Sequence, residues 1–159
     1  MTTQHLITKR SSHVVAVGRL IGAHATLTRE LSAQLVADHG LTLSEYEVLM
    51  LLARAPDGVM RRIDLAHEVR LSPSGVTRML DRLEAGGLVC KASCDKDARV
   101  TYAQLTEAGV AKLEECAPGH VAAAERLLSE RFDADELASL VELLGRLSAP
   151  ADDECGPGG

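Results

Sequence analysis

Aromatic side chains are scarce in this chain of 159 residues, which has no tryptophan and only Tyr46, Tyr102 and Phe132. The hydrophobic fraction of 46% is nevertheless enough for one domain with a sizeable core. That core must be built from leucine, valine, alanine and methionine. Such a composition favours helices packed on helices and argues against a β-sandwich.

Long apolar runs are also missing. No stretch approaches the roughly 20 residues that cross a bilayer, and the N-terminal sequence MTTQHLITKR lacks the apolar core of a signal peptide. We therefore expect a cytoplasmic protein with no membrane partner. The chain also lacks a nucleophile–base set and a phosphate-binding glycine loop, so we do not expect an enzyme.

Apolar residues recur at three- and four-residue steps in long segments at both ends of the chain. The first predicted helix covers residues 9–38 and ends at Gly40. A second long helix is predicted over residues 106–131 with a kink at Pro118-Gly119, and a last helix opens at Asp133.

These terminal helices are not needed to complete the small unit between them. Their apolar stripes would stay exposed unless they packed on each other across a two-fold axis, which predicts a homodimer. We therefore assign residues 1–40 and 106–149 to a helical dimerisation region. The tail, residues 150–159 (PADDECGPGG), is expected to be disordered.

Residues 41–105 have a different organisation. The predicted elements are a helix from Thr42, a turn at 56–58, helices at about 61–69 and 73–85, and strands at 88–92 and 100–105 around a polar loop. Helix, turn, helix and hairpin in this order predict a winged helix-turn-helix, which places one helix in the DNA major groove and a loop beside it. We expect a mainly α fold with a small β-hairpin wing, and residues 41–105 as its DNA-binding region.

The net charge of −6 is compatible with DNA binding only because the charge is unevenly distributed along the sequence. Residues 61–99 carry eight basic and six acidic side chains, a balance of +2, which leaves −8 for the remainder. Local positive charge decides phosphate contact, because remote acidic charge is screened over about 10 Å.

Three motifs, with matching spacing, resemble those of the MarR (multiple antibiotic resistance regulator) family over about residues 10–148. They are LSPSGVTRMLDRLEAGGLV at residues 71–89, Asp97-Ala98-Arg99 as the D-x-R of the wing, and Leu105-Thr106-Glu107-Ala108-Gly109 as the L-T-x-x-G. The resemblance implies a triangular homodimer that binds a pseudo-palindromic operator in double-stranded DNA. It also implies a repressor, usually released by a small ligand, a metal or an oxidant.

Short polar side chains and a guanidinium gather at the start of the predicted recognition helix, where they can reach base edges and phosphates. They are Ser72, Ser74, Thr77 and Arg78. One turn later, Arg82 is predicted to contact a phosphate. The alternative is that Arg82 pairs with a nearby carboxylate such as Asp81 or Glu84.

The wing supplies a second set of candidates. Arg99 resembles the arginine that enters the minor groove in this family, and Asp97 would orient it by a charge-assisted hydrogen bond. The alternative is a purely structural Asp97–Arg99 pair. Further candidates for phosphate contact are Lys91, Lys96, Arg61 and Arg62, the last two being equally acceptable on a solvated face.

The family's effector pocket lies between the first two helices and the base of the DNA-binding region. Candidate lining residues here are Arg10, His13, Arg19, Glu45 and Tyr46. An arginine and a histidine in such a cleft would suit an aromatic carboxylate. We expect no required cofactor.

Other readings use the same fold. Six histidines could contribute to a zinc site, although no tight H-x3-H spacing is present. Cys90 and Cys94 flank the hairpin and could form a redox switch, although the four cysteines include no CxxC pair and a cytoplasmic chain disfavours disulfides. A protein-interaction module that has lost DNA binding is the remaining alternative. Arg78, Arg82 and Arg99 argue against it.

Overall fold

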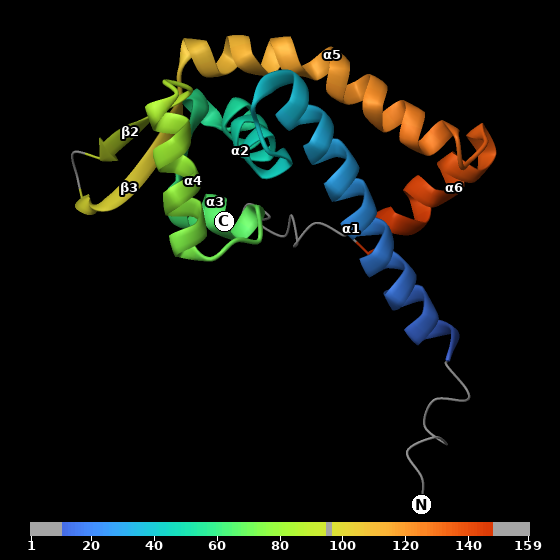
Figure 1. Cartoon of the computed structure of the whole chain (residues 1–159). Coiled ribbons are helices and arrows are strands. Elements are labelled where there is room, and N and C mark those ends of the chain that lie inside the picture. Colours follow the sequence, from blue (N-terminus) through green and yellow to red (C-terminus); the bar gives the residue numbers. More distant parts are fainter. Residues whose placement is uncertain (1–10, 95–96, 148–159) are drawn as a thin grey trace, which may run out of the picture. The chain divides into compact units, whose positions relative to one another are not determined.

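The computed structural model describes residues 11–94 and 97–147 and is drawn in Figure 1. The chain divides into two units, one extending to Val121 and one beginning at Ala122. The elements in chain order are α1 (Ser12–His39), α2 (Leu43–Arg54), the 3-10 turn η2 (Pro56–Gly58), β1 (Val59–Arg61), α3 (Arg62–Glu68), α4 (Pro73–Ala85), β2 (Val89–Cys94), β3 (Asp97–Leu105), α5 (Glu107–Ser129) and α6 (Ala134–Gly145). The mainly α fold with a small hairpin is confirmed.

The junction between α1 and α2 follows the local signals in the sequence. Gly40 adopts the left-handed conformation (φ 70°) that ends α1. Thr42 and Glu45 form the predicted capping box at the start of α2, in which each residue's side chain bonds the other's backbone amide. The backbone N–H of Leu43 also donates to Ser32 Oγ on α1, at 3.3 Å, which joins the two helices.

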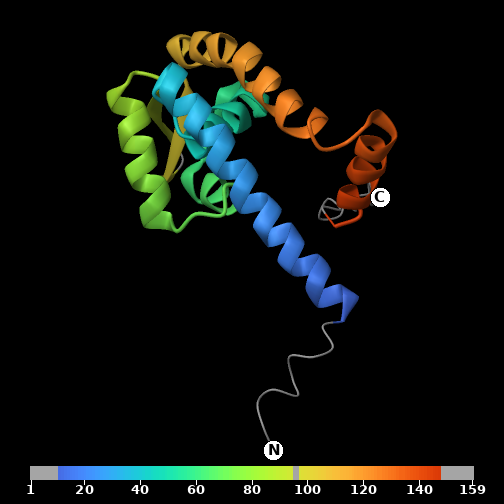
Figure 2. The same cartoon turned by 45° about the vertical axis from the view of Figure 1, so that its right-hand side comes forward.

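The core of the first unit is almost entirely aliphatic, as the composition predicts. It is formed by residues from α1 to α5: Leu35, Leu41, Tyr46, Val48, Leu49, Leu52, Leu65, Ala66, Val76, Met79, Leu80, Leu83, Val89, Ala103, Leu113 and Cys116. Residues 12–25 of α1 are all exposed and contribute nothing to this core. Figure 2 shows this half of α1 extending away from the other elements of the unit.

The sheet is larger than the sequence predicts. Its order is β1-β3-β2, with both pairs antiparallel, and β1 was not predicted. The predicted hairpin loop at 93–99 was too long, because β2 continues to Cys94 and β3 begins at Asp97. The polar residues at the hairpin tip pair through backbone hydrogen bonds, which require no apolar side chains.

The L-T-x-x-G motif joins the hairpin to α5. Thr106 Oγ1 accepts the backbone N–H of Gly109 at 3.0 Å and donates to the carbonyl of Gly87 at 2.6 Å. Gly109 packs against the carbonyl of Leu88 so closely that a Cβ atom would overlap it. The motif therefore allows α5 to pack closely against the turn between α4 and β2.

The second unit contains the end of α5 and α6. The predicted start of α6 is confirmed, since Asp133 and Glu136 form a capping box. The helix α5 continues through Pro118 without interruption to Ser129. No residue of α6 is buried, and its apolar residues Val141 and Leu143 are exposed.

Candidate nucleic-acid interface

The helix α4, which the sequence identifies as the recognition helix, is defined at its start by two adjacent residues. Ser72 Oγ accepts the backbone N–H of Gly75 at 3.1 Å, and Pro73 occupies the first helical position, where its missing N–H costs nothing. The buried face of α4 consists of Val76, Met79, Leu80 and Leu83. Burial of these four side chains fixes which side of the helix faces solvent.

The opposite side carries the predicted base-reading residues. We call Ser72, Ser74, Thr77 and Arg78 the reading face, and all four are exposed. Thr77 Oγ1 donates to the Pro73 carbonyl at 2.9 Å, and the two serine hydroxyls lie 3.2 Å apart. Among the ion pairs of the described residues, none includes Arg78, so its guanidinium is available to a ligand.

Arg82, on the last turn of α4, is paired with a carboxylate. The partner is Glu45 on α2, whereas the sequence suggested Asp81 or Glu84. Arg82 Nε and Nη2 lie 2.9 Å and 2.8 Å from Glu45 Oε1. The pairing alternative raised from the sequence is therefore present, across 37 positions of the chain.

Two more of the predicted phosphate contacts are paired with acidic residues of α4. Lys91 Nζ on β2 lies 3.1 Å from Glu84, and Arg62 on α3 lies 4.0 Å from Asp81. Both contacts cross from α4 to a neighbouring element. Within its own turn, Arg61 pairs with Asp64 at 2.8 Å. These cations must exchange a carboxylate for a phosphate if they contact DNA.

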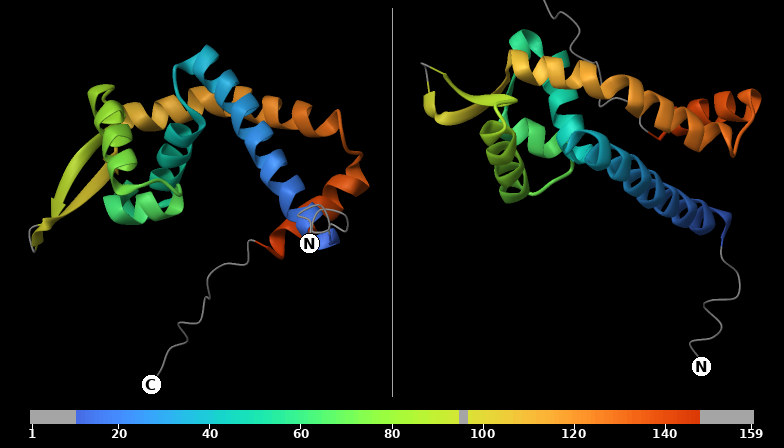
Figure 3. Two further views of the ribbon diagram at one scale, coloured as in Figure 1. Left: turned by 60° about the horizontal axis from the view of Figure 1, so that its bottom comes forward. Right: turned by 45° about the horizontal axis from the view of Figure 1, so that its top comes forward.

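The hairpin of β2 and β3 extends beyond the helices beside α4, as Figures 1 and 3 show. Lys91 lies exposed on β2. Asp97 and Arg99 lie on β3 and not in a loop, but their side chains are outside the described part of the structure. Lys96 lies outside the described residues altogether. Minor-groove contact by Arg99 stays a prediction.

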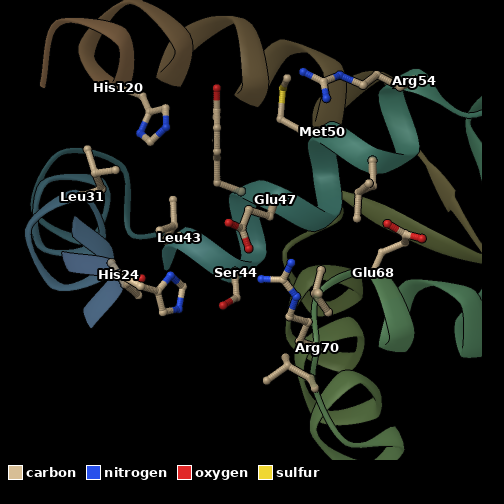
Figure 4. A pocket seen from close by; sticks show the side chains of 15 residues that line it. His24, Leu31, Leu43, Ser44, Glu47, Met50, Arg54, Glu68, Arg70 and His120 are labelled. Carbon is tan, nitrogen blue, oxygen red and sulfur yellow. The ribbon is translucent and has the colours of Figure 1, made fainter. Parts of the chain in front are cut away.

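A cavity of about 790 Å³ lies within the first unit. Figure 4 shows side chains reaching it from α1, α2, α5 and the turn between α3 and α4. It is lined by His24, Thr28, Leu31, Leu43, Ser44, Tyr46, Glu47, Met50, Leu51, Arg54, Glu68, Val69, Arg70, Leu71 and His120. Residues 69–71 form the turn that leads into α4, so this cavity adjoins the start of the reading face.

Two aromatic rings stand at one side of this cavity. The ring centroids of Tyr46 and His120 are 4.6 Å apart and tilted by 46°. Burial lowers the pKa of His120, and its Nδ1 is buried without a hydrogen-bond partner among the described residues. Burial also raises the pKa of Tyr46. Both rings are therefore neutral near pH 7 and offer a surface for stacking.

Of the five residues predicted to line an effector pocket, Tyr46 lines this cavity. Glu45 is buried and bonded to Arg82. His13 and Arg19 belong to the exposed half of α1 and are not among the lining residues. Arg10 lies outside the described residues. The prediction placed the pocket too close to the N-terminus because helical register alone does not show where α1 leaves the core.

The sequence prediction also missed two arginines and two histidines that line the cavity, namely Arg54, Arg70, His24 and His120. A signal was present on α2, where Leu43, Glu47 and Arg54 follow at steps of four and seven and so share one helix face. Arg70 could not be found this way, because it lies in a turn with φ of 53°.

Sites for other chemistry are not apparent in the described residues. No three histidine, cysteine or acidic side chains among them form a group that could hold a metal ion. Cys116 is fully buried, and this burial raises the pKa of its thiol, whereas Cys90 is exposed. None of the described helices combines the length and apolar character that a membrane span requires.

Comparison with known proteins gives a consistent result. A family model described as "MarR family" matches residues 39–100. The HTH-type transcriptional regulator MhqR of Bacillus subtilis is 31% identical over 113 residues, which cover 71% of this chain and 76% of the relative. The homoprotocatechuate degradative operon repressor of Escherichia coli is 31% identical over 110 residues, covering 69% and 72%.

The solved structures agree with this result. A MarR family transcriptional regulator from Streptomyces coelicolor, solved in complex with DNA, superposes with a TM-score of 0.76 and 30% identity, over 87% of this chain and 88% of that one. Its likeness extends over the terminal helices as well as the winged helix. On the strength of its winged helix, its motifs and these relatives, the chain belongs to the MarR family of helix-turn-helix transcriptional regulators.

Proposed function

We propose that this regulator acts as a homodimer, binds a pseudo-palindromic operator and represses its target genes until a small ligand releases it. The observation that carries the proposal is the reading face, which stands exposed on a helix whose other side is buried in the core. The DNA complex of the related regulator and the repressor name of another relative support it. The cytoplasmic location expected from the sequence accords with this role.

DNA recognition can be tested with fragments flanking the protein's own gene, because regulators of this kind commonly control neighbouring genes. We expect fluorescence anisotropy to show tight binding to one fragment in the presence of excess random DNA. Specific binding is typically at least about 10³-fold tighter than non-specific binding. A protein-interaction module would bind all fragments equally weakly, and that result would reject DNA recognition.

The dimer is supported by apolar surface that the single chain leaves uncovered. On α1, Val17 and Ile21 are 55% and 65% exposed, and Val141 and Leu143 on α6 are 66% and 54% exposed. A soluble protein rarely leaves so many large apolar side chains in contact with water unless another surface covers them. A two-fold dimer would also present two reading faces to half-sites about 34–36 Å apart.

The dimer can be tested by placing charge on this surface without touching the core. Deleting residues 1–35 would be an unsuitable test, because the deletion would also remove Leu35, which is fully buried in the core. We expect the double variant Val17→Glu/Ile21→Glu to sediment as a folded monomer. The matched control Arg29→Glu changes an exposed charged position of the same helix and should stay dimeric. A dimeric double variant would show that α1 does not form the interface.

For the ligand we propose a small aromatic carboxylate bound in the cavity at α2. The guanidinium groups of Arg54 and Arg70 can receive a carboxylate, and Tyr46 and His120 provide aromatic surface. Glu47 and Glu68 also line the cavity, so a bound carboxylate must contact an arginine and lie away from these two side chains. An occupant would contact residues 68–71 and thereby the segment that positions α4.

Benzoate and its neutral counterpart benzamide provide a test that isolates the charge. We expect benzoate to raise the melting temperature and to weaken operator binding, and benzamide to do neither at the same concentration. An Arg54→Gln/Arg70→Gln variant should lose the benzoate effect. Equal effects of benzoate and benzamide, or none across a panel of substituted benzoates, would reject the proposed ligand class.

A further inference from the structure

We propose that Arg82 is a positioning residue for the recognition helix: paired with the buried Glu45, it sets the orientation of α4 and does not itself contact DNA. This inference rests on the proposed DNA-binding function. It assigns to the second arginine of α4 a role different from that of Arg78, which lies one turn earlier on the same helix.

The geometry of the pair is that of a fixed contact. Arg82 directs two nitrogens at one oxygen, with Nε and Nη2 at 2.9 Å and 2.8 Å from Glu45 Oε1. The other carboxylate oxygen, Oε2, accepts the backbone N–H and the hydroxyl of Thr42 at 2.8 Å and 2.9 Å. All four donors hold the Glu45 carboxylate, so neither it nor the arginine can turn freely.

Burial makes this pair different from a surface ion pair. The side chain of Glu45 is 7% exposed, whereas that of Arg82 is 63% exposed. A carboxylate removed from water needs a compensating charge, and taking away one partner of such a pair is strongly unfavourable. If Arg82 turned to a phosphate, it would leave Glu45 without its cation. Release of Arg82 to DNA is therefore opposed by the cost of stranding a buried negative charge.

The pair lies where orientation of α4 can be controlled. Glu45 belongs to the capping box of α2, and the adjacent Leu43 donates its N–H to Ser32 on α1. Arg82 lies on the last turn of α4, at the end away from Ser72 and Ser74. The apolar face of α4 determines its depth in the core, through contacts that have no directional preference. The charged hydrogen bonds supply direction and connect α4 to α2.

Two substitutions separate positioning from phosphate contact. Glu45→Gln keeps the capping box, in which glutamine replaces glutamate well, but removes the charge that holds Arg82. Arg82→Ala removes the guanidinium. Arg29→Ala serves as the control, because Arg29 is 68% exposed and, among the described residues, forms an ion pair only with its neighbour Glu30 on α1. Circular dichroism and sedimentation establish that each variant is a folded dimer.

For positioning, we expect both variants to weaken operator binding by about tenfold while binding to random DNA is nearly unchanged, because misplacing α4 disturbs the contacts that read bases. The slope of log affinity against log salt concentration should stay that of the wild type, and the double variant should be no weaker than the weaker single variant. Arg29→Ala should bind as the wild type does.

Phosphate contact by Arg82 gives the opposite pattern. In Arg82→Ala, the slope of log affinity against log salt concentration would then become shallower by about 1.8, because each dimer would lose two phosphate contacts. Glu45→Gln would bind the operator as tightly as the wild type or more tightly, because this variant frees the arginine. Either result overturns the inference. A purely structural role would lower operator and random binding together, which also overturns it. Failure of the wild type to discriminate between DNA sequences would instead reject the proposed function.

A third variant covers the case in which alanine prevents folding. Arg82→Lys keeps a positive charge for a phosphate but cannot direct two nitrogens at one carboxylate oxygen in the same way. We expect Arg82→Lys to recover only part of the operator affinity. Full recovery of affinity, with the wild-type salt slope, would show that Arg82 acts through its charge on DNA.

Discussion

Gly109, in the first turn of α5, lies against the main-chain carbonyl of Leu88 with no room for a side chain. A Cβ atom at this position would overlap the carbonyl oxygen and lie 2.6 Å from Leu105 Cδ1. The same oxygen accepts the backbone N–H of Thr106 at 3.1 Å. The turn after α4, the end of β3 and the start of α5 therefore meet at one carbonyl group.

We expect Gly109→Ala to lower the free energy of unfolding by about 2–3 kcal/mol, because backbone must shift to admit the methyl group. Urea denaturation followed by circular dichroism measures the change. Gly22→Ala is the matched control, since nothing lies within 4 Å of a Cβ on this helical glycine. It should stabilise by about 0.5–1 kcal/mol. Wild-type stability in Gly109→Ala would contradict the close approach.

Arg70 has φ of 53° in the turn before α4, a conformation that costs a residue with a Cβ about 1–2 kcal/mol. We expect Arg70→Gly to stabilise the protein by about 0.5–1 kcal/mol, since glycine removes the strain but adds freedom to the unfolded chain. Arg70→Val should destabilise it, because a β-branched side chain tolerates this conformation least. Urea midpoints of the three proteins in the opposite order would refute the assignment.

His120 should make the folded state sensitive to mild acid. Burial lowers its pKa from the ordinary value of 6.5, so the unfolded chain takes up a proton at a higher pH than the folded protein. Stability contributed by neutral His120 is therefore complete above about 6.5, falls as pH drops below that value, and levels off below the folded pKa.

The measurement is the unfolding free energy between about pH 7.5 and pH 5.5, the range in which histidines titrate. His120→Gln should lose less stability over this range than the wild type. His67→Gln, at a side chain that is 90% exposed, should follow the wild-type curve. If the His120→Gln and wild-type curves are parallel, burial of this ring does not govern the acid response.

Arg78 and Arg99 should differ in what they recognise. Arg78 stands on the reading face, so Arg78→Ala should lose base discrimination together with affinity, by about 1–3 kcal/mol for one good base contact. Arg99→Ala should weaken binding broadly and most at A·T-rich flanks, where a narrow minor groove attracts arginine. Binding of both variants to an operator panel with central and flanking changes distinguishes them. Wild-type binding by Arg99→Ala on every operator would remove the wing from the interface.

Most of the fold could be read from the sequence because its signals are local. Ser72 and Pro73 mark the start of α4, Thr42 and Glu45 that of α2, and Gly40 the end of α1, each through contacts within a few residues. The strand β1 could not be found in this way. It is three residues long, and Met60 pairs with Ala103, so its existence depends on a partner far along the chain.

In the candidate site too, features set by local sequence could be predicted and features set by long-range contacts could not. The reading face was predictable because the buried residues of α4 recur with helical period and leave one polar side. The partner of Arg82 was not, since Asp81 and Glu84 were nearer in sequence than Glu45, which approaches only when α2 packs on α4. Most of the cavity's lining was missed for a similar reason, although Tyr46 was predicted: His24 and His120 are far apart in the sequence and line one cavity only in the folded unit.

The paired cations around α4 have a consequence for how quickly the protein can search a chromosome. Lys91 is paired with Glu84, and Arg62 is paired with Asp81. If either cation turned to a phosphate, its former carboxylate partner would be left unpaired near the negatively charged DNA backbone. If these residues contact phosphate, a random sequence offers no base contacts to offset this exchange, so we expect encounters with it to be brief. With about 10⁶–10⁹ competing sites in a genome, short stops at wrong positions leave more molecules free to reach the right one.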